Sequence, residues 1–142
     1  MTVATRKNFL GIALYEPEEN EAYMSRAQRN HFANVLKLWS KHLLLETDDF
    51  KVSLQTDESY VDDIDRASLE ESQRMRLRAS DRRRKLHRKV NDAYVRLQSG
   101  EYGYCKTCGD EIGLSRLEVR PTAEECINCK TVAEIYEKRS TE

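Results

Sequence analysis

The chain has 142 residues, of which 39% are hydrophobic and 35% are charged, and its formal net charge is -1 at pH 7. This length and composition favour one domain with a small core and much solvated helix. No apolar run approaches the roughly 20 residues that a membrane-spanning helix needs, so we expect a soluble protein that does not act in a membrane.

Residues 1–24 lack a sustained hydrophobic period. A short apolar patch at residues 8–15 is followed by an acidic stretch at residues 16–21. Without a period of 3.6 or 2, neither a helix nor a strand is indicated. We therefore predict an N-terminal arm that packs on the globular part of the protein.

A helix start is indicated at Ser25, because Gln28 follows three residues later as the partner of a capping box. The apolar residues beyond it recur at alternating steps of four and three, which is the seam of a coiled coil. They are Phe32, Leu36, Trp39, Leu43 and Phe50. A compact helical bundle is the alternative, but it needs a wider apolar face.

A second helix is predicted from Asp65 onward, because the chain contains no proline or glycine until Gly100. Its seam is clear late in the helix, at Leu86, Val90, Ala93 and Leu97. Earlier in the helix, the same steps of four and three give a seam that is poorer in apolar residues. It consists of Ser72, Arg76, Ala79 and Arg83. Two helices of about 30 residues each would form an antiparallel hairpin about 45 Å long. We place this hairpin at residues 25–99 and its tip near residues 56–67.

Charge is segregated along the second half of this hairpin. Residues 57–71 contain seven acidic side chains and one basic one, whereas residues 74–89 contain nine arginines and lysines and one acid. The simplest interpretation is a solvated surface. A more specific hypothesis is a thin probe whose acidic end enters a basic channel, with a shaft that binds nucleic acid or another anion.

All four cysteines fall into two Cys-x-x-Cys pairs: Cys105 with Cys108, and Cys126 with Cys129. This spacing is typical of a zinc site. Four thiolates complete a tetrahedral shell and leave no position for water, so we expect a structural metal and no hydrolysis. A disulfide framework is the alternative. It is disfavoured because the N-terminus shows no secretory hydrophobic segment, which points to a reducing cytoplasm.

The region around the cysteines, residues 100–142, is predicted to be a small globular module. Gly109 allows a tight turn in which backbone N–H groups point at thiolate sulfur. Residues 112–119 are expected to form short strand-like pieces, and residues 131–138 a final helix with Val132, Ile135 and Tyr136 on one side. The predicted fold class is mainly α: a long antiparallel coiled-coil hairpin with a four-cysteine zinc-finger module and a C-terminal helix.

Several segments resemble the DksA/TraR family over about residue 23 to the C-terminus. They are DDIDRA at 62–67, RRRKL at 82–86, YGYC at 102–105, RLEVRPTA at 116–123 and CKTVAEI at 129–135. The resemblance implies a bacterial transcription factor whose coiled coil enters the secondary channel of RNA polymerase and alters the stability of promoter open complexes. It also implies that ppGpp strengthens this effect by binding between the factor and the polymerase rim.

The resemblance also assigns expected roles to individual residues. Those implied at the polymerase active-site tip are Asp62, Asp65 and Ala67. Those implied to bind ppGpp are Leu86, Lys89, Arg120 and Lys130, with Arg82 as a further basic position. Family members commonly have a proline where this chain has Asp63, so the tip here carries one more negative charge.

Two other functions are compatible with the same features. A channel factor that stimulates transcript cleavage also carries an acidic coiled-coil tip, whose carboxylates help to hold a catalytic Mg²⁺. A zinc ribbon that binds nucleic acid would use the basic shaft for phosphate contacts. A dithiol redox role is weaker. The histidines are scattered and show no Ser-His-acid pattern, so we predict that the protein is not an enzyme. The family resemblance implies a regulator that binds the polymerase without reading DNA sequence, and we expect it to be a monomer.

Overall fold

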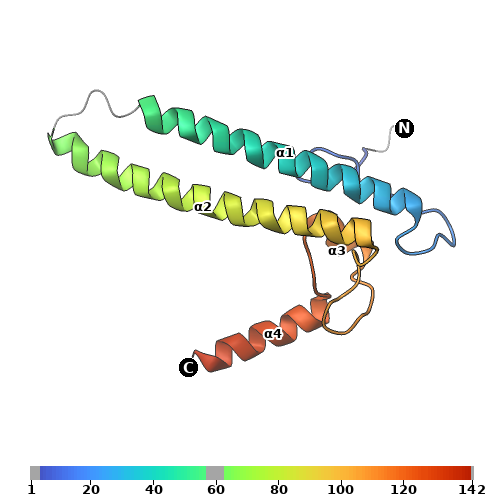
Figure 1. Ribbon diagram of the computed structural model, residues 1–142. Helices are drawn as coiled ribbons and strands as arrows, with labels where there is room; N and C mark the ends of the chain where they lie inside the picture. Colours follow the sequence, from blue (N-terminus) through green and yellow to red (C-terminus); the bar gives the residue numbers. More distant parts are fainter. Residues whose placement is uncertain (1–3, 57–62, 142) are drawn as a thin grey trace.

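Two long antiparallel helices lie side by side in the computed structural model and form a narrow hairpin (Figure 1). The structure describes the backbone of residues 4–56 and 63–141, and the side chains of these except residues 47–56 and 63–64. Helix α1 spans Arg26–Thr56 and α2 spans Asp63–Ser99. Two shorter helices follow, α3 over Leu114–Val119 and α4 over Ile127–Ser140. The predicted helical fold class is confirmed.

Helix α1 begins where the capping pattern indicates. The Gln28 backbone N–H donates to Ser25 Oγ over 3.3 Å, which satisfies one of the free donors at the helix start. The return bond differs from a standard capping box, because Gln28 Oε1 accepts from the Met24 N–H, over 2.8 Å. The amide of Gln28 also donates to Ala22 O, so this buried side chain ties the arm to the first turn of the helix.

The two predicted seams meet in the half of the hairpin nearest the zinc module. Their buried members are Phe32, Leu36, Leu43, Val90, Ala93 and Leu97, with Trp39 and Leu86 partly buried against them. Phe50 lies among the residues whose side chains are not described. The poorer seam of α2 also faces inward, since Ser72, Arg76, Ala79 and Arg83 are half-buried. Along the described part of α2, the inward face therefore changes from apolar near the zinc module to more polar farther from it.

A polar cluster links the two helices. Ser40 Oγ on α1 lies 3.0 Å from His87 Nε2 on α2, and Asn91 Nδ2 lies 3.4 Å from His87 Nδ1. Donor and acceptor roles at the two ring nitrogens follow the tautomer, and His87 bridges Ser40 and Asn91 in either one. The cluster therefore joins the two helices.

The segment after Ile112 corrects one expectation, because residues 114–119 form helix α3 instead of strand-like pieces. Gly113, at φ 98°, turns the chain into the helix. Leu117 and Glu118 are adjacent and both buried, which departs from the alternation of a half-buried strand. Within residues 4–56 and 63–141 there is no strand, only isolated antiparallel bridges from Lys7 to Ala13 and from Tyr104 to Glu111.

The last helix, α4, begins four residues earlier than predicted. Cys126 caps it, with its Sγ accepting from the Cys129 backbone N–H over 3.5 Å, so the helix starts inside the second cysteine pair. It then extends away from the hairpin (Figure 1). The apolar side predicted from Val132, Ile135 and Tyr136 is exposed. Among the described residues, none of the helices combines the length and apolar character that crossing a bilayer requires.

The N-terminal arm lies against both the hairpin and the zinc module. Phe9 packs edge-on against Trp39 of α1, with ring centroids 5.0 Å apart. The backbone N–H of Tyr15 donates to Glu118 Oε1 on α3 over 2.8 Å. His31 Nε2 is 2.7 Å from the same oxygen, within ion-pair range but without the alignment of a hydrogen bond. One buried carboxylate thus joins the arm, α1 and α3.

Candidate metal centre and anion pocket

The four cysteines converge at the base of the hairpin. Their Sγ atoms all lie within 4.8 Å of one another, and the Cys108 and Cys126 sulfurs are 3.7 Å apart. Tetrahedral zinc with Zn–S bonds of about 2.3 Å places its sulfurs about 3.8 Å apart, so the cluster fits this metal. Zinc held by Cys105, Cys108, Cys126 and Cys129 would supply a structural cross-link between the two cysteine pairs.

The first cysteine pair is shaped by its backbone. Gly109, at φ 79°, closes a tight turn in which its N–H donates to Cys105 O over 2.8 Å. Backbone N–H groups of Cys108 and then Cys126 lower the pKa of Cys105 to about 6, which favours the thiolate that zinc requires. Hydrogen bonds with the side chains of Cys126 and Cys108 instead raise the pKa of Cys129. Because zinc binds the thiolate form of cysteine, metal binding releases protons from such a site.

Next to the metal cluster lies a basic cavity of about 250 Å³, which we call the anion pocket. Its charged lining consists of Lys89, Lys106, Arg116, Arg120, Lys130, Glu124 and Glu125. Lys89 comes from α2, Arg120 ends α3 and Lys130 lies in α4. Three residues that the family resemblance assigns to ppGpp are therefore brought to one cavity from three segments.

The other two residues assigned to the nucleotide lie apart from this lining. Leu86 is half-buried and packs on the hydrophobic core of the hairpin. Arg82 lines a different hollow on the shaft, together with Arg78 and Asp81. Distance along α2 explains the separation, because Arg82 precedes Lys89 by about two helical turns.

Sequence reasoning missed two cations of the anion pocket, Arg116 and Lys106. Arg116 lies one helical turn before Arg120, whose backbone N–H donates to Arg116 O over 2.8 Å. That spacing of four residues was a usable signal. Arg116 Nε donates to Glu125 O over 3.1 Å, which holds the guanidinium at the cavity wall. Lys106 carried no comparable signal, because its partner is remote in sequence.

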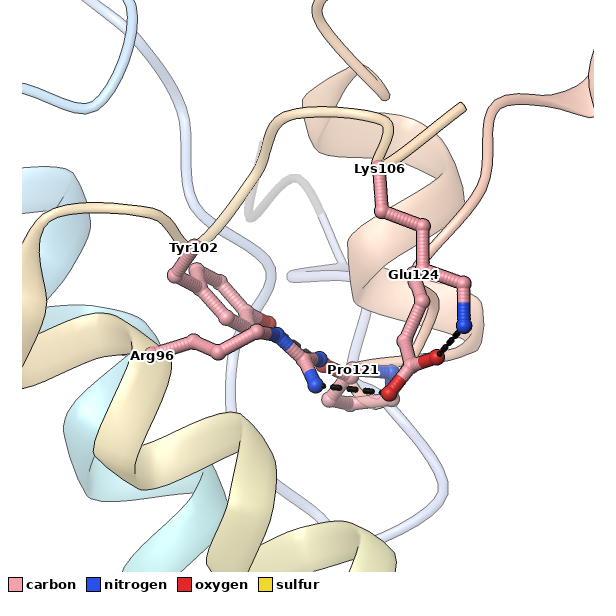
Figure 2. A network of polar contacts seen from close by, with 5 residues as sticks. All are labelled: Arg96, Tyr102, Lys106, Pro121 and Glu124. Carbon is pink, nitrogen blue, oxygen red and sulfur yellow. Dashed lines mark hydrogen bonds and ion pairs between the residues drawn. The ribbon is translucent and has the colours of Figure 1, made fainter. Parts of the chain in front are cut away.

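A polar network fixes the zinc module to the end of α2 (Figure 2). Arg96 Nη1 lies 2.8 Å from Glu124 Oε1, and Lys106 Nζ lies 2.7 Å from Glu124 Oε2. The buried Tyr102 hydroxyl donates to Pro121 O over 2.6 Å. The backbone N–H of Lys106 also donates to Glu124 O over 2.9 Å. The anion pocket therefore has a wall that is held rigidly on the hairpin.

Two of the residues assigned to the tip, Asp65 and Ala67, lie near the start of α2, whereas Lys89 of the anion pocket lies toward the other end of the helix. Asp65 and Ala67 are exposed in the first turns of the helix. Asp63 is the first residue of α2, and its side chain is not described. Asp62 falls outside the described residues. The two candidate sites are thus separated by most of the length of one helix.

Comparison with known proteins gives a family match for each of two parts of the chain, the hairpin and the zinc module. Residues 28–97 match the family model of the DnaK suppressor protein DksA, N-terminal domain. Residues 100–134 match the prokaryotic dksA/traR C4-type zinc finger. The second match covers all four cysteines of the cluster, so this module is a zinc finger of the C4 type.

Individual relatives agree with these matches. Proteins named RNA polymerase-binding transcription factor DksA from Salmonella typhimurium and Escherichia coli K12 are each 42% identical over 130 residues, covering 91% of this chain and 86% of theirs. The Haemophilus influenzae protein of the same name is 40% identical, covering 91% and 90%. The solved structure of transcription factor DksA2 from Pseudomonas aeruginosa matches with a TM-score of 0.77 and 37% identity, covering 88% of this chain and 95% of that one.

Proposed function

The chain belongs to the DksA family, and from this membership we propose that it is a bacterial, cytoplasmic regulator that binds RNA polymerase directly. The hairpin, residues 25–99, inserts into the secondary channel and alters the lifetime of promoter open complexes. The zinc module, residues 100–142, rests on the channel rim, and the arm, residues 1–24, packs on it. The protein acts as a monomer, is not an enzyme and does not recognise a DNA sequence.

The observation that carries the proposal is the separation of two unlike sites on one stiff rod. The free end of the hairpin bears the exposed Asp65 and Ala67, while the base holds the zinc cluster and the anion pocket. A narrow rod with an acidic end suits a channel that attracts anions, and its wider base limits how far it enters. Helices of 31 and 37 residues give this rod a reach of about 46 to 55 Å.

We propose further that the anion pocket binds ppGpp at the polymerase rim. Lys89, Arg120 and Lys130 present cations from three segments toward one cavity, which suits a ligand with clustered phosphates. Arginine offers a planar fork of donors and lysine a compact point charge, so the set can bind phosphate oxygens from several directions. Polymerase would complete the site, since a cavity of about 250 Å³ is small for a whole nucleotide.

A purified transcription assay tests the proposal. Decay of an open complex at a ribosomal RNA promoter is followed with the cognate polymerase, with and without the protein and ppGpp. We expect the protein to shorten the lifetime and ppGpp to shorten it further. An unchanged lifetime under all conditions would contradict the assigned function. Replacing both Lys89 and Arg120 by alanine should remove most of the added effect of ppGpp.

The tip assignment has its own test. Asp65→Asn removes an exposed negative charge without removing a packing contact, so polymerase binding should persist while the effect on open-complex lifetime falls by at least tenfold. Binding is measured by competition and lifetime by filter retention. Asp92→Asn changes another exposed acid farther along α2 and is the matched control. Equal activity of the two variants would refute a special role for Asp65.

The alternatives predict other outcomes. A transcript-cleavage factor would shorten the RNA in a stalled elongation complex, whereas we expect no shortening. A nucleic-acid-binding zinc ribbon would offer aromatic platforms, but Tyr102 is buried and Tyr104 packs edge-on against Tyr23, with centroids 5.6 Å apart. Tyr104 is still 40% exposed, so of these two tyrosines only one offers part of its ring for base stacking, which disfavours stacking on this module.

A further inference from the structure

An unusual feature of the anion pocket is that two acidic residues, Glu124 and Glu125, lie among its cations. Glu124 lines the cavity, and both of its oxygens are engaged, one by Arg96 and the other by Lys106 (Figure 2). A negative charge at this position repels an incoming phosphate. The cation that neutralises it from the cavity side, Lys106, is the same kind of group that a phosphate would recruit.

The two cations on Glu124 differ in how firmly they are placed. The Arg96 side chain is 23% exposed and lies at the base of the module, outside the lining of the anion pocket. The Lys106 side chain is 63% exposed and lines that pocket. An exposed lysine ion pair contributes little to stability, and the lysine side chain is a flexible four-carbon stem. Lys106 can therefore exchange one anion for another at a small cost in free energy.

Resting on the nucleotide site proposed above, we propose that Glu124 is an internal competitor for that site. In the absence of ligand its carboxylate holds Lys106. When a polyphosphorylated nucleotide binds, Lys106 moves from Glu124 to a phosphate oxygen, and Arg96 remains on the carboxylate and balances its charge. Lys106 is then a further phosphate-binding residue, and Glu124 sets the concentration of nucleotide at which the site fills.

This arrangement favours ligands that carry several phosphates. A monoanion gains too little from Lys106 to offset the repulsion by Glu124 and the loss of the existing pair. A ligand with clustered phosphates can contact Lys106 together with Lys89, Arg120 and Lys130, because all four line the same cavity. The carboxylate therefore acts as a filter against single small anions such as inorganic phosphate.

A double-mutant cycle tests the exchange. Binding of labelled ppGpp is measured on the complex of cognate polymerase with full-length wild type, Lys106→Ala, Glu124→Gln and the double variant, and the signal of polymerase alone is subtracted. We expect Lys106→Ala to weaken binding about fivefold and Glu124→Gln to strengthen it about threefold, as removal of single exposed charges does. In the double variant the gain from Glu124→Gln should fall well below threefold, since only the direct repulsion by Glu124 is relieved and there is no Lys106 to release.

Controls separate this exchange from damage to the module. Lys138→Ala removes an exposed lysine outside the anion pocket and should bind as wild type does. Zinc content and the urea midpoint of each variant are measured, and Lys106→Gln replaces the alanine variant if the latter has lost zinc. Weaker binding by a zinc-replete Glu124→Gln variant would show a positioning role and overturn the inference. A threefold gain that persists without Lys106 would overturn it as well.

The failure of this inference can be told from the failure of the proposed function. If ppGpp binds the wild-type complex no better than polymerase alone, the proposed nucleotide site is wrong and the inference falls with it. If binding is lost in Arg120→Ala but unchanged in Lys106→Ala, the nucleotide site stands and only the exchange by Lys106 is refuted.

Discussion

The hairpin and the zinc module are stabilised in different ways, although they share one core where they meet. The hairpin depends on a cluster of buried apolar side chains from both helices near its base, including Phe32 and Leu36 of α1 and Val90 and Ala93 of α2. The module buries side chains of its loops and of α3, such as Tyr102, Ile112 and Leu117, and it gathers four thiols around one point. A rod can thus stay helical where packing is poor, whereas a module of this size needs a metal to fix its loops.

Removing the metal should give the largest difference between the two regions. We expect a zinc chelator, or Cys108→Ser, to loosen the module while most helical signal from α1 and α2 remains, because metal binding contributes on the order of 10 kcal/mol to a site of this kind. Far-ultraviolet circular dichroism reports the helices, and protease sensitivity near residues 105–126 reports the module. Thr107→Ser is the control within the same loop. A joint loss of all helical signal would show that the hairpin also depends on zinc.

Shortening a core side chain should affect the hairpin next most strongly. Leu36 is 1% exposed at the centre of the seam, so Leu36→Ala should lower the free energy of unfolding by about 2 to 5 kcal/mol. Leu44, on the same helix but 53% exposed, provides the matched control, and Leu44→Ala should cost less than about 0.5 kcal/mol. Urea unfolding measures both. Similar costs would show that the seam does not dominate hairpin stability.

A change at the contact between the hairpin and the zinc module should lower stability less, and this loss should depend on pH. Tyr102→Phe leaves Pro121 O without its buried donor and should cost about 1 to 3 kcal/mol, whereas Tyr136→Phe changes an exposed ring and should cost almost nothing. Burial raises the pKa of Tyr102 above its ordinary value of 10.0. The folded state therefore holds this proton more tightly than the unfolded state does.

The sign of the pH effect follows from that shift. The contribution of Tyr102 is complete below pH 10.0 and declines as the pH rises above that value, because the unfolded chain then releases the proton more readily. Urea midpoints measured between pH 8 and 11 should fall more steeply for wild type than for Tyr102→Phe. Parallel curves would mean that another group governs the alkaline loss of stability.

The sequence was most informative where its pattern was long. The seam on α2 could be predicted from Val90, Ala93 and Leu97 because a helical period persists over several turns. Cysteine spacing similarly predicted convergence on one metal, which the geometry of the four sulfurs matches. In both cases the local pattern and the final contact involve the same residues, so little long-range information was needed.

Short segments and remote contacts were harder to predict. The six residues of α3 are too few for a period to separate helix from strand, and the deciding contact, burial of Leu117 against the core, is tertiary. Docking of the N-terminal arm depends on the hydrogen bond between Tyr15 and Glu118, which are 103 residues apart in the chain. The role of Lys106 likewise depends on Glu124, 18 residues away, and neither residue belongs to a recognisable motif.

Helix α2 runs without interruption from the acidic tip of the hairpin to its basic base, so the length of this helix fixes the distance between the two ends. Asp65 and Lys89 both lie on it, 24 residues and therefore about 36 Å apart. The distance of the tip from the base is thus set by the number of helical residues between them and does not depend on a hinge. Removing seven residues from α2 and seven from the facing part of α1 would keep every side chain on its face, because seven residues make almost two whole turns, yet it would withdraw the tip by about 10 Å.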